Sequence, residues 1–522
     1  MLVSALYAGM TTVSETAHRE DPAFTVKRAR PDDFGEGGRS FAPGDSTGRL
    51  AHSRLHLAEP DRVLSSVMAS DSPISGIASA EDPAEPPRRM SGVRAGVIVF
   101  IGIGFANVGN YLFQLIAARA LGPGQYGDLA ALTAVAALIT LPLGGIQAAV
   151  AREVATLDAS KHHALAAARI RRALGIALGI GGIVAALLTL SSGLIQQLLD
   201  IASLPAVVLT MALVVPAFLM PVLVGWLQGV QRFGLLSVTL SLGPLIRIAL
   251  LAVVVAGGWG VAGAIGATLV ASAAALVIPL ATLRGHVGRD IPRSLGHFDW
   301  MKGLRRSFPV VIGLLALTAL STLDVVVANV TLSGQQAGIY SSASLIARVI
   351  LYLSAAIVTV LLPKVSERSA LELDTKAILS ASLLATAVLS AVATIIYAVF
   401  SSTIVSLTVG AEYADAAPLL WIFALAMSGY ALLNVLLFDD LGHGGTRMVK
   451  VLLVGTAGQL CGYAIFHDSV WQLVTVSAVS AALLLLVHEA FVDASLLRAA
   501  RSSRTVVREI GASSRRRPTR AS

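Results

Sequence analysis

The stretch Ala117–Ala155, AARALGPGQYGDLAALTAVAALITLPLGGIQAAVAREVA, joins two long apolar runs through a short Gly/Pro turn and ends in charged residues. A looser copy, LSGQQAGIYSSASLIARVILYLSAAIVTVLLPKVSE, follows 211 positions later at Leu332–Glu367. The identical positions are Leu121, Gln125, Gly127, Ala136 and Ile146, which correspond to Leu332, Gln336, Gly338, Ala347 and Ile357. Two membrane segments can share a glycine-containing turn by chance, but the repeat favours a chain built from two halves of one design.

The composition places the chain in a membrane. Of its 522 residues, 55% are hydrophobic and only 13% are charged, with a mean hydropathy of +0.76. About a quarter of the residues of soluble proteins are charged. The single cysteine, Cys461, lies in an apolar run, so neither a disulfide within the chain nor a cysteine-based metal site is available, and a small core residue is expected there.

The positive charge is concentrated at the C-terminal end. The formal net charge is +8, and residues 498–522 hold eight arginines and one glutamate. A basic soluble face would suggest nucleic acid, but a basic tail after the last apolar run suits the anionic headgroups of a cytoplasmic leaflet. We therefore expect a bilayer with anionic headgroups as a partner, and no nucleic acid.

The chain divides by composition. Residues 1–89 carry ten Lys/Arg and thirteen Asp/Glu among Pro, Gly and Ser, which predicts a disordered cytoplasmic extension without a secretory signal. Met90 is an alternative start of translation, because the composition changes abruptly there. Beyond it we expect a first six-helix bundle at 90–283, a basic cytoplasmic linker at 284–307, a second bundle at 308–497 and an Arg-rich cytoplasmic tail at 498–522.

Twelve apolar runs are long enough to cross a hydrocarbon core of about 30 Å, which takes about 20 helical residues. They span 95–117, 126–151, 173–198, 204–229, 234–256, 259–283, 308–330, 335–363, 375–400, 416–438, 448–466 and 469–496. Long runs without strict alternation favour helices over barrel strands, so we expect an all-α polytopic membrane protein.

The loop charges predict the orientation. The loops after even-numbered spans hold seventeen Lys and Arg residues, whereas the odd-numbered loops hold only Arg119. The positive-inside rule then places the even loops and both termini in the cytoplasm. Six spans on each side of the linker make the repeat parallel, and transporters built this way bind substrate between halves that rock to alternate access.

Five further patterns lie in order along the membrane portion. They are ARALGPGQYGDLAAL at 118–132, GGIQAAVAREVA at 144–155, LQGVQRF at 227–233, LDVVVANVTLSGQQAGIYSSA at 323–343 and VGAEYADAAPLLWIFALA at 409–426. Together they resemble the polysaccharide and oligosaccharide-lipid flippase family of the multidrug/oligosaccharidyl-lipid/polysaccharide (MOP) exporter superfamily. The resemblance covers residues 95–500 and implies a MATE-like fold, in which two six-helix bundles surround a central cavity lined by helices 1 and 7.

The resemblance implies a transporter that flips a lipid-linked oligosaccharide, a polyprenyl-diphosphate glycan, across the cytoplasmic (inner) cell membrane for polysaccharide and cell-envelope biosynthesis. Glycan assembly enzymes are candidate partners. A cation-coupled multidrug exporter is an alternative, although it favours an acidic, aromatic cavity and only 6% of this chain is aromatic. A lipid II flippase typically has fourteen helices, and a membrane polysaccharide polymerase or ligase usually has a larger outer loop than 401–415.

Polar residues form a stripe on the first predicted helix. Asn107, Asn110 and Gln114 occupy positions i, i+3 and i+7, and Thr318 and Ser321 are the repeat equivalents of the two asparagines. The two stripes could line one aqueous cavity and contact substrate there. The alternative is interhelical hydrogen bonding that holds the bundle together, a common use of such side chains in membranes.

Charged residues inside spans are the strongest candidates, because each costs about 2.5–3.5 kcal/mol at a helix centre. Arg247 and Arg348 could hold a diphosphate; the alternatives are snorkelling or, for Arg348, an ion pair with Asp324. Asp324 would modulate the arginines or couple transport to a cation, as could Glu489 in the last span. Arg119 is expected to point into the cavity mouth and contact substrate, with capping or packing at the helix end as the alternative.

The sequence contains no phosphate-binding P-loop, no recognisable catalytic arrangement and no metal-ligand spacing. We therefore expect a protein that is not an enzyme and has no bound cofactor or metal. ATP-driven transport would need a separate subunit, which leaves Na⁺, H⁺ or the membrane potential as candidate energy sources.

Overall fold

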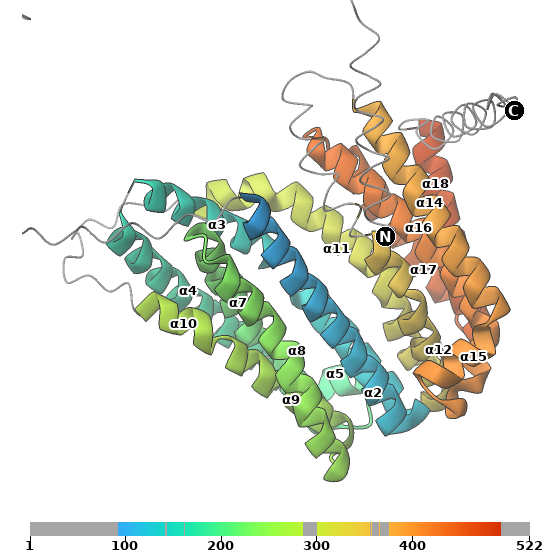
Figure 1. Cartoon of the computed structure of the whole chain (residues 1–522). Coiled ribbons are helices and arrows are strands. Elements are labelled where there is room, and N and C mark those ends of the chain that lie inside the picture. The colour runs from blue at the N-terminus through green and yellow to red at the C-terminus, as the bar shows by residue number, and fades with distance from the viewer. Residues whose placement is uncertain are drawn as a thin grey trace, which may run out of the picture. The chain divides into compact units, whose positions relative to one another are not determined.

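The computed structural model describes residues 92–140, 143–160, 162–284, 300–354 and 375–491, together with Ile357 and Val365. The predicted extension 1–89, the tail 498–522 and most of the linker 284–307 lie outside the described residues. Within the described part, every regular element is a helix (Figure 1). The first half contains α2 (Gly92–Thr140), α3 (Gly144–Ala159), α4 (His163–Leu190), α5 (Ser192–Leu198), α6 (Leu204–Ala212), α7 (Val214–Gly229), α8 (Phe233–Ala256), α9 (Gly260–Ala275) and α10 (Val277–Arg284).

The second half has the same all-helical character. It contains α11 (Trp300–Thr331), α12 (Gly334–Ala347), α14 (Lys376–Val399), α15 (Ser401–Thr408), the 3₁₀ helix η2 (Ala411–Leu419), α16 (Leu420–Gly442), α17 (Arg447–Ile465) and α18 (Val470–Phe491).

Twelve membrane crossings follow from these helices. The described residues contain 11 stretches long and apolar enough to span a membrane, and the first of them, Ile98–Thr140, has 43 residues. At about 1.5 Å per residue such a helix would measure about 65 Å, twice the hydrocarbon thickness. Gly122, with φ 71° and ψ 170°, interrupts it and divides it into two crossings. The described residues therefore confirm the prediction of twelve spans in an all-α membrane protein.

Prolines explain two breaks within crossings. Pro216 has no N–H to donate to the carbonyl of Ala212, and α6 ends at Ala212. In the same way Pro279 cannot donate to Ala275, where α9 ends. These two crossings, α6 with α7 and α9 with α10, therefore each consist of two helices that meet at a proline-induced junction.

Some predicted boundaries shift. The third crossing runs over His163–Leu190 rather than 173–198. It begins earlier than predicted because the arginines before residue 173 are good helix formers, and their long side chains reach polar surroundings from the end of the helix. The tenth begins at Ala411 rather than 416, directly after Gly410 with φ 110°. Cys461 is exposed on α17 instead of lying in the core. The face of a membrane span that contacts lipid accommodates such a small apolar side chain.

The two halves pack through a shared core. In the first half α2 packs against α8, as Figure 1 shows, and α3 and α4 both pack against α7. In the second half α16 packs against α14 and α18, and α11 packs against α17. Contacts of α12 with α2, and of α11 with α2 and α3, join the halves. The largest cluster of buried side chains accordingly contains residues of both halves.

We call the end of the bundle that holds the turns at Gly122, Gly258 and Gly410 the outer end, following the predicted orientation, and the opposite end the inner end. Trp259 and Trp471 lie at the outer end and are 61% and 45% exposed. Tryptophan gathers at membrane interfaces, where its ring is partly wet. These residues therefore mark the level of one interface, while the assignment of that interface to the cell exterior stays a prediction.

Candidate functional site

Repeat-equivalent glycines bring the halves together at the outer end. An ideal Cβ on Gly127 would lie 3.1 Å from the main-chain nitrogen of Gly338, and a Cβ on Gly338 would overlap the carbonyl oxygen of Pro123. Only a glycine lets two backbones approach this closely within a membrane. We call this arrangement of Pro123, Gly127 and Gly338 the glycine contact.

Hydrogen bonds reinforce the glycine contact. Nδ2 of Asn329 in α11 donates to Oδ1 of Asp128 at 3.4 Å and to the carbonyl of Leu199 at 3.0 Å. Tyr413 donates from its hydroxyl to the carbonyl of Ala118 at 2.7 Å. Each bond joins one half to the other. The outer end is therefore closed in this structure by backbone contact and by polar links that the sequence alone did not predict.

Arg119 belongs to this closure. Its guanidinium donates to the carbonyl of Ser406 at 3.2 Å and to that of Leu407, in the last turn of α15. Carbonyls at a helix C-terminus are unsatisfied and carry partial negative charge, which a guanidinium complements. The observed geometry is therefore the alternative considered from the sequence, capping at a helix end, while the predicted contact of Arg119 with substrate stays a prediction.

Arg247 faces the polar stripe of the first crossing. Its guanidinium lies 3.5 Å from the centre of the Phe113 ring, and its Nη1 is 3.5 Å from Oδ1 of Asn110. The Nε of Arg247 is buried and makes no hydrogen bond in the described part of the chain. The cation–π contact holds the charge in place while leaving a donor available.

The structure separates the members of the stripe. Asn110 contacts Arg247, and Asn107 is exposed one turn nearer the inner end. Gln114 is half-buried, and its Oε1 has no hydrogen-bond partner among the described residues. No hydrogen bond of these three side chains to a residue of the second half occurs in the described ranges. Their predicted contact with substrate stays a prediction.

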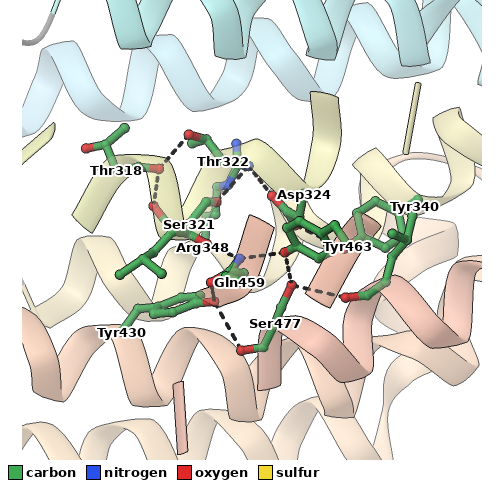
Figure 2. A network of polar contacts seen from close by, with 12 residues as sticks. Thr318, Ser321, Thr322, Asp324, Tyr340, Arg348, Tyr430, Gln459, Tyr463 and Ser477 are labelled. Carbon is green, nitrogen blue, oxygen red and sulfur yellow. Dashed lines mark hydrogen bonds and ion pairs between the residues drawn. The ribbon is translucent and has the colours of Figure 1, made fainter. Parts of the chain in front are cut away.

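Asp324 and Arg348 lie together in the second half (Figure 2). The carboxylate is 1% exposed, and its Oδ2 accepts a hydrogen bond from the Tyr340 hydroxyl at 3.2 Å. Nη2 of Arg348 is 3.8 Å from Oδ1 of Asp324 and donates to the carbonyl of Ser321 at 3.1 Å. The ion pair considered from the sequence is thus present, at a distance near the limit for such a pair.

A buried polar network surrounds Asp324 (Figure 2). The hydroxyl of Tyr430 is 3.0 Å from Oε1 of Gln459 and 3.1 Å from the carbonyl of Ser477. Nε2 of Gln459 donates to the hydroxyl of Tyr463 at 2.6 Å, and this hydroxyl is 2.6 Å from Oγ of Ser477. The sequence analysis missed these residues, although each is a polar group inside an apolar run, which is the signal that singled out Asp324.

Glu489 is not part of this network. It follows Ser477 by 12 positions on α18, which places it about 18 Å nearer the inner end at 1.5 Å per residue. The structure therefore does not bring together the two acidic residues predicted to balance or couple charge.

The charges of Arg247 and Arg348, one from each half, both act on Tyr126. Both Arg247 and Arg348 lie within electrostatic range of the hydroxyl of Tyr126, which is buried beside the glycine contact. The Nε of Arg348, like that of Arg247, is buried without a hydrogen bond. A guanidinium with a spare donor can bind an anion that carries several charged oxygens. Among the described residues, no group of three or more His, Cys, Asp or Glu could hold a metal ion.

Solved structures with a similar fold define the class of protein. An inward-facing multidrug resistance MATE family transporter of the MOP superfamily is 17% identical, with a TM-score of 0.58, over 79% of this chain and 99% of that one. The lipid II flippase MurJ in an inward closed conformation is 14% identical, with a TM-score of 0.60, over 81% and 93% of the two chains. The protein is thus a multi-pass membrane protein with the fold of the MOP superfamily.

The sequence places the protein within that class. Residues 93–369, more than half of the chain, match the model of the family described as polysaccharide biosynthesis protein. The chain belongs to this polysaccharide biosynthesis family, which confirms the resemblance drawn from its motifs. No curated protein matches the chain.

Proposed function

We propose that the protein is a flippase that moves a lipid-linked oligosaccharide, a polyprenyl-diphosphate glycan, from the inner to the outer leaflet of the cytoplasmic membrane for cell-envelope polysaccharide assembly. The observation that carries the proposal is the placement of Arg247 and Arg348. They come from opposite halves, lie within electrostatic range of the same tyrosine, and each keeps a buried Nε without a partner. A diphosphate supplies the acceptors that these donors lack.

The closed outer end suggests the order of events. With the glycine contact formed, a substrate reaches the arginines from the inner end or from between helices, and its diphosphate binds them. Release to the outer leaflet requires the contacts of Gly338, Asn329 and Arg119 to break while contacts at the inner end form, as in transporters built from parallel repeats. Asp324 is the residue through which a Na⁺ or H⁺ gradient would act, and glycosyltransferases or a polymerase would supply or consume the glycan.

Two other transport functions are less well supported. A multidrug exporter binds organic cations, which Arg247 and Arg348 would repel across the low-dielectric interior of the bundle. The similarity to the lipid II flippase MurJ is one of fold, at 14% identity. The model of the polysaccharide biosynthesis family matches more than half of this chain. This match favours a lipid-linked oligosaccharide used in polysaccharide synthesis over lipid II as the substrate.

The test is transport by the purified protein in proteoliposomes that contain a polyprenyl-diphosphate oligosaccharide. Arg247→Ala and Arg348→Ala, made singly, should each lower the rate about 10-fold to 150-fold, since a hydrogen bond to a charged group contributes about 1.5–3 kcal/mol. Lysine at either position should lower it less than alanine if charge alone matters. Arg232→Ala, at an exposed arginine in the N-cap position of α8, is the matched control. Unchanged transport by both alanine variants at normal protein levels would refute the proposal.

A further inference from the structure

In the Asp324–Arg348 ion pair, each side chain keeps a buried polar atom without a hydrogen-bond partner among the described residues. The single contact of Nη2 with Oδ1 measures 3.8 Å, beyond the distance of a hydrogen bond. The Ser344 hydroxyl and the Val325 N–H lie beside the carboxylate of Asp324, but its Oδ1 is buried and accepts no hydrogen bond of ordinary geometry in the described part of the chain, and Nε of Arg348 is buried without an acceptor. Buried polar atoms are almost always satisfied, so atoms left open on both partners call for an explanation.

Asp324 is not what orients Arg348. The guanidinium is held by its 3.1 Å hydrogen bond to the carbonyl of Ser321, one turn before Asp324 on α11. Arg348 also follows the end of α12 directly, so its main chain is placed by that helix. The carboxylate in turn is held by Tyr340 at 3.2 Å. Each partner would keep its position if the other lost its charge.

Arg348 is the full positive charge that Asp324 faces. The other titratable side chains that interact with the carboxylate from the packed helices are the hydroxyls of Tyr340 on α12, Tyr430 on α16 and Tyr463 on α17, and these are neutral. An opposite charge in a low-dielectric interior acts strongly on its partner. A carboxylate 3.8 Å from the guanidinium must therefore weaken the attraction of that guanidinium for any other anion.

We propose that Asp324 competes with the diphosphate of the substrate for Arg348. The inference rests on the proposed function and deepens it. The resting carboxylate lowers the affinity of the site for a diphosphate, which makes release possible, and neutralising Asp324 by a cation frees Arg348 for the substrate. The carboxylate and the diphosphate thus compete for the charge of the same guanidinium, and the charge state of Asp324 sets the affinity.

Two substitutions around the same carboxylate should move the affinity in opposite directions. Asp324→Asn keeps the shape of the side chain and removes the competing charge, so the affinity should rise. Tyr340→Phe removes the hydroxyl that donates to Asp324; measured at a pH at which Asp324 stays ionised, the charge of the carboxylate is then more available to Arg348, so the affinity should fall. A carboxylate that only supported the fold or positioned Arg348 would lose affinity in both variants.

The experiment measures binding of farnesyl diphosphate to the full-length protein in nanodiscs. Competition predicts that Asp324→Asn binds farnesyl diphosphate about 5-fold to 150-fold more tightly, the change in affinity that corresponds to typical coupling free energies. Tyr340→Phe should bind more weakly, and Asp468→Asn, which removes an exposed carboxylate, should match the parent protein. Adding Arg348→Gln to Asp324→Asn should abolish the gain.

The outcomes separate the inference from the proposed function. If the parent protein binds farnesyl diphosphate and Asp324→Asn binds it equally or more weakly, the competition is overturned while the flippase proposal stands. If neither the parent protein nor Asp324→Asn binds any diphosphate, both fail. Tighter binding by Asp324→Asn together with weaker binding by Tyr340→Phe supports the competition.

Discussion

Gly338→Ala should hold the outer end open. A Cβ at this position would overlap the carbonyl oxygen of Pro123, which is backbone and cannot rotate away. The overlap exists only while the halves meet at the glycine contact. Alanine also favours a helix over glycine by about 1 kcal/mol, but this gain applies whether the outer end is open or closed. The substitution should therefore change the balance between the two states without lowering the stability of the fold.

The size of the effect follows from the cost of overpacking. An extra methyl group in a well-packed site costs about 1–3 kcal/mol. Since about 1.4 kcal/mol is a factor of ten in an equilibrium constant, closure of the outer end should become about 5-fold to 150-fold less favourable. Gly124→Ala is the matched control, because a Cβ there would meet nothing within 4 Å.

Labelling of a cysteine beneath the contact measures the fraction of open protein. The exposed Cys461 is first replaced by serine, and a cysteine is placed at Gln114, two helical turns inward of Gly122. A membrane-impermeant maleimide added from the outside should react faster in Gly338→Ala by the factor above, and at the parent rate in Gly124→Ala. Equal labelling of both variants and the parent, with all three folded, would show that the glycine contact does not close the outer end.

Two further substitutions probe the polar contacts. Asn329→Ala removes the hydrogen bonds to Asp128 and to the carbonyl of Leu199. This should destabilise the closed state by about 1–3 kcal/mol and accelerate the same labelling reaction. An unchanged rate would mean that these bonds do not hold the halves together. Tyr430→Phe leaves the buried Oε1 of Gln459 without the hydroxyl of Tyr430 and should lower the thermal midpoint in detergent, whereas Tyr352→Phe, at a residue 50% exposed, should leave it unchanged. Equal midpoints for the two variants would contradict a stabilising role for the network.

The sequence predicted the architecture because each relevant signal is local. In lipid every backbone polar group must be satisfied within its own span, so length and hydropathy identify a crossing without knowledge of its neighbours. The Gly/Pro turn at Gly122 separated the first two crossings in the sequence, and the same glycine interrupts α2 in the structure. The repeat likewise singled out Gly127 and Gly338, the two residues that meet at the outer end.

The sequence did not show which polar groups contact one another in the fold. Arg119 and the carbonyl of Ser406 are 287 positions apart, and Asn329 and Asp128 are 201 apart, so no periodicity relates them. Asp324 and Glu489 carry the same sequence signal, an acid inside a span, yet only Asp324 lies in the buried network.

The sequence by itself therefore determined the class of protein, the number of crossings, the repeat and the charged residues that need compensation. Only the tertiary structure showed that Arg119 caps a helix of the opposite half and that Arg348 forms a long ion pair with Asp324. The physical reason is that hydropathy acts on one helix at a time. A partner for a buried polar group is instead chosen by helix packing, which brings together residues far apart in the chain.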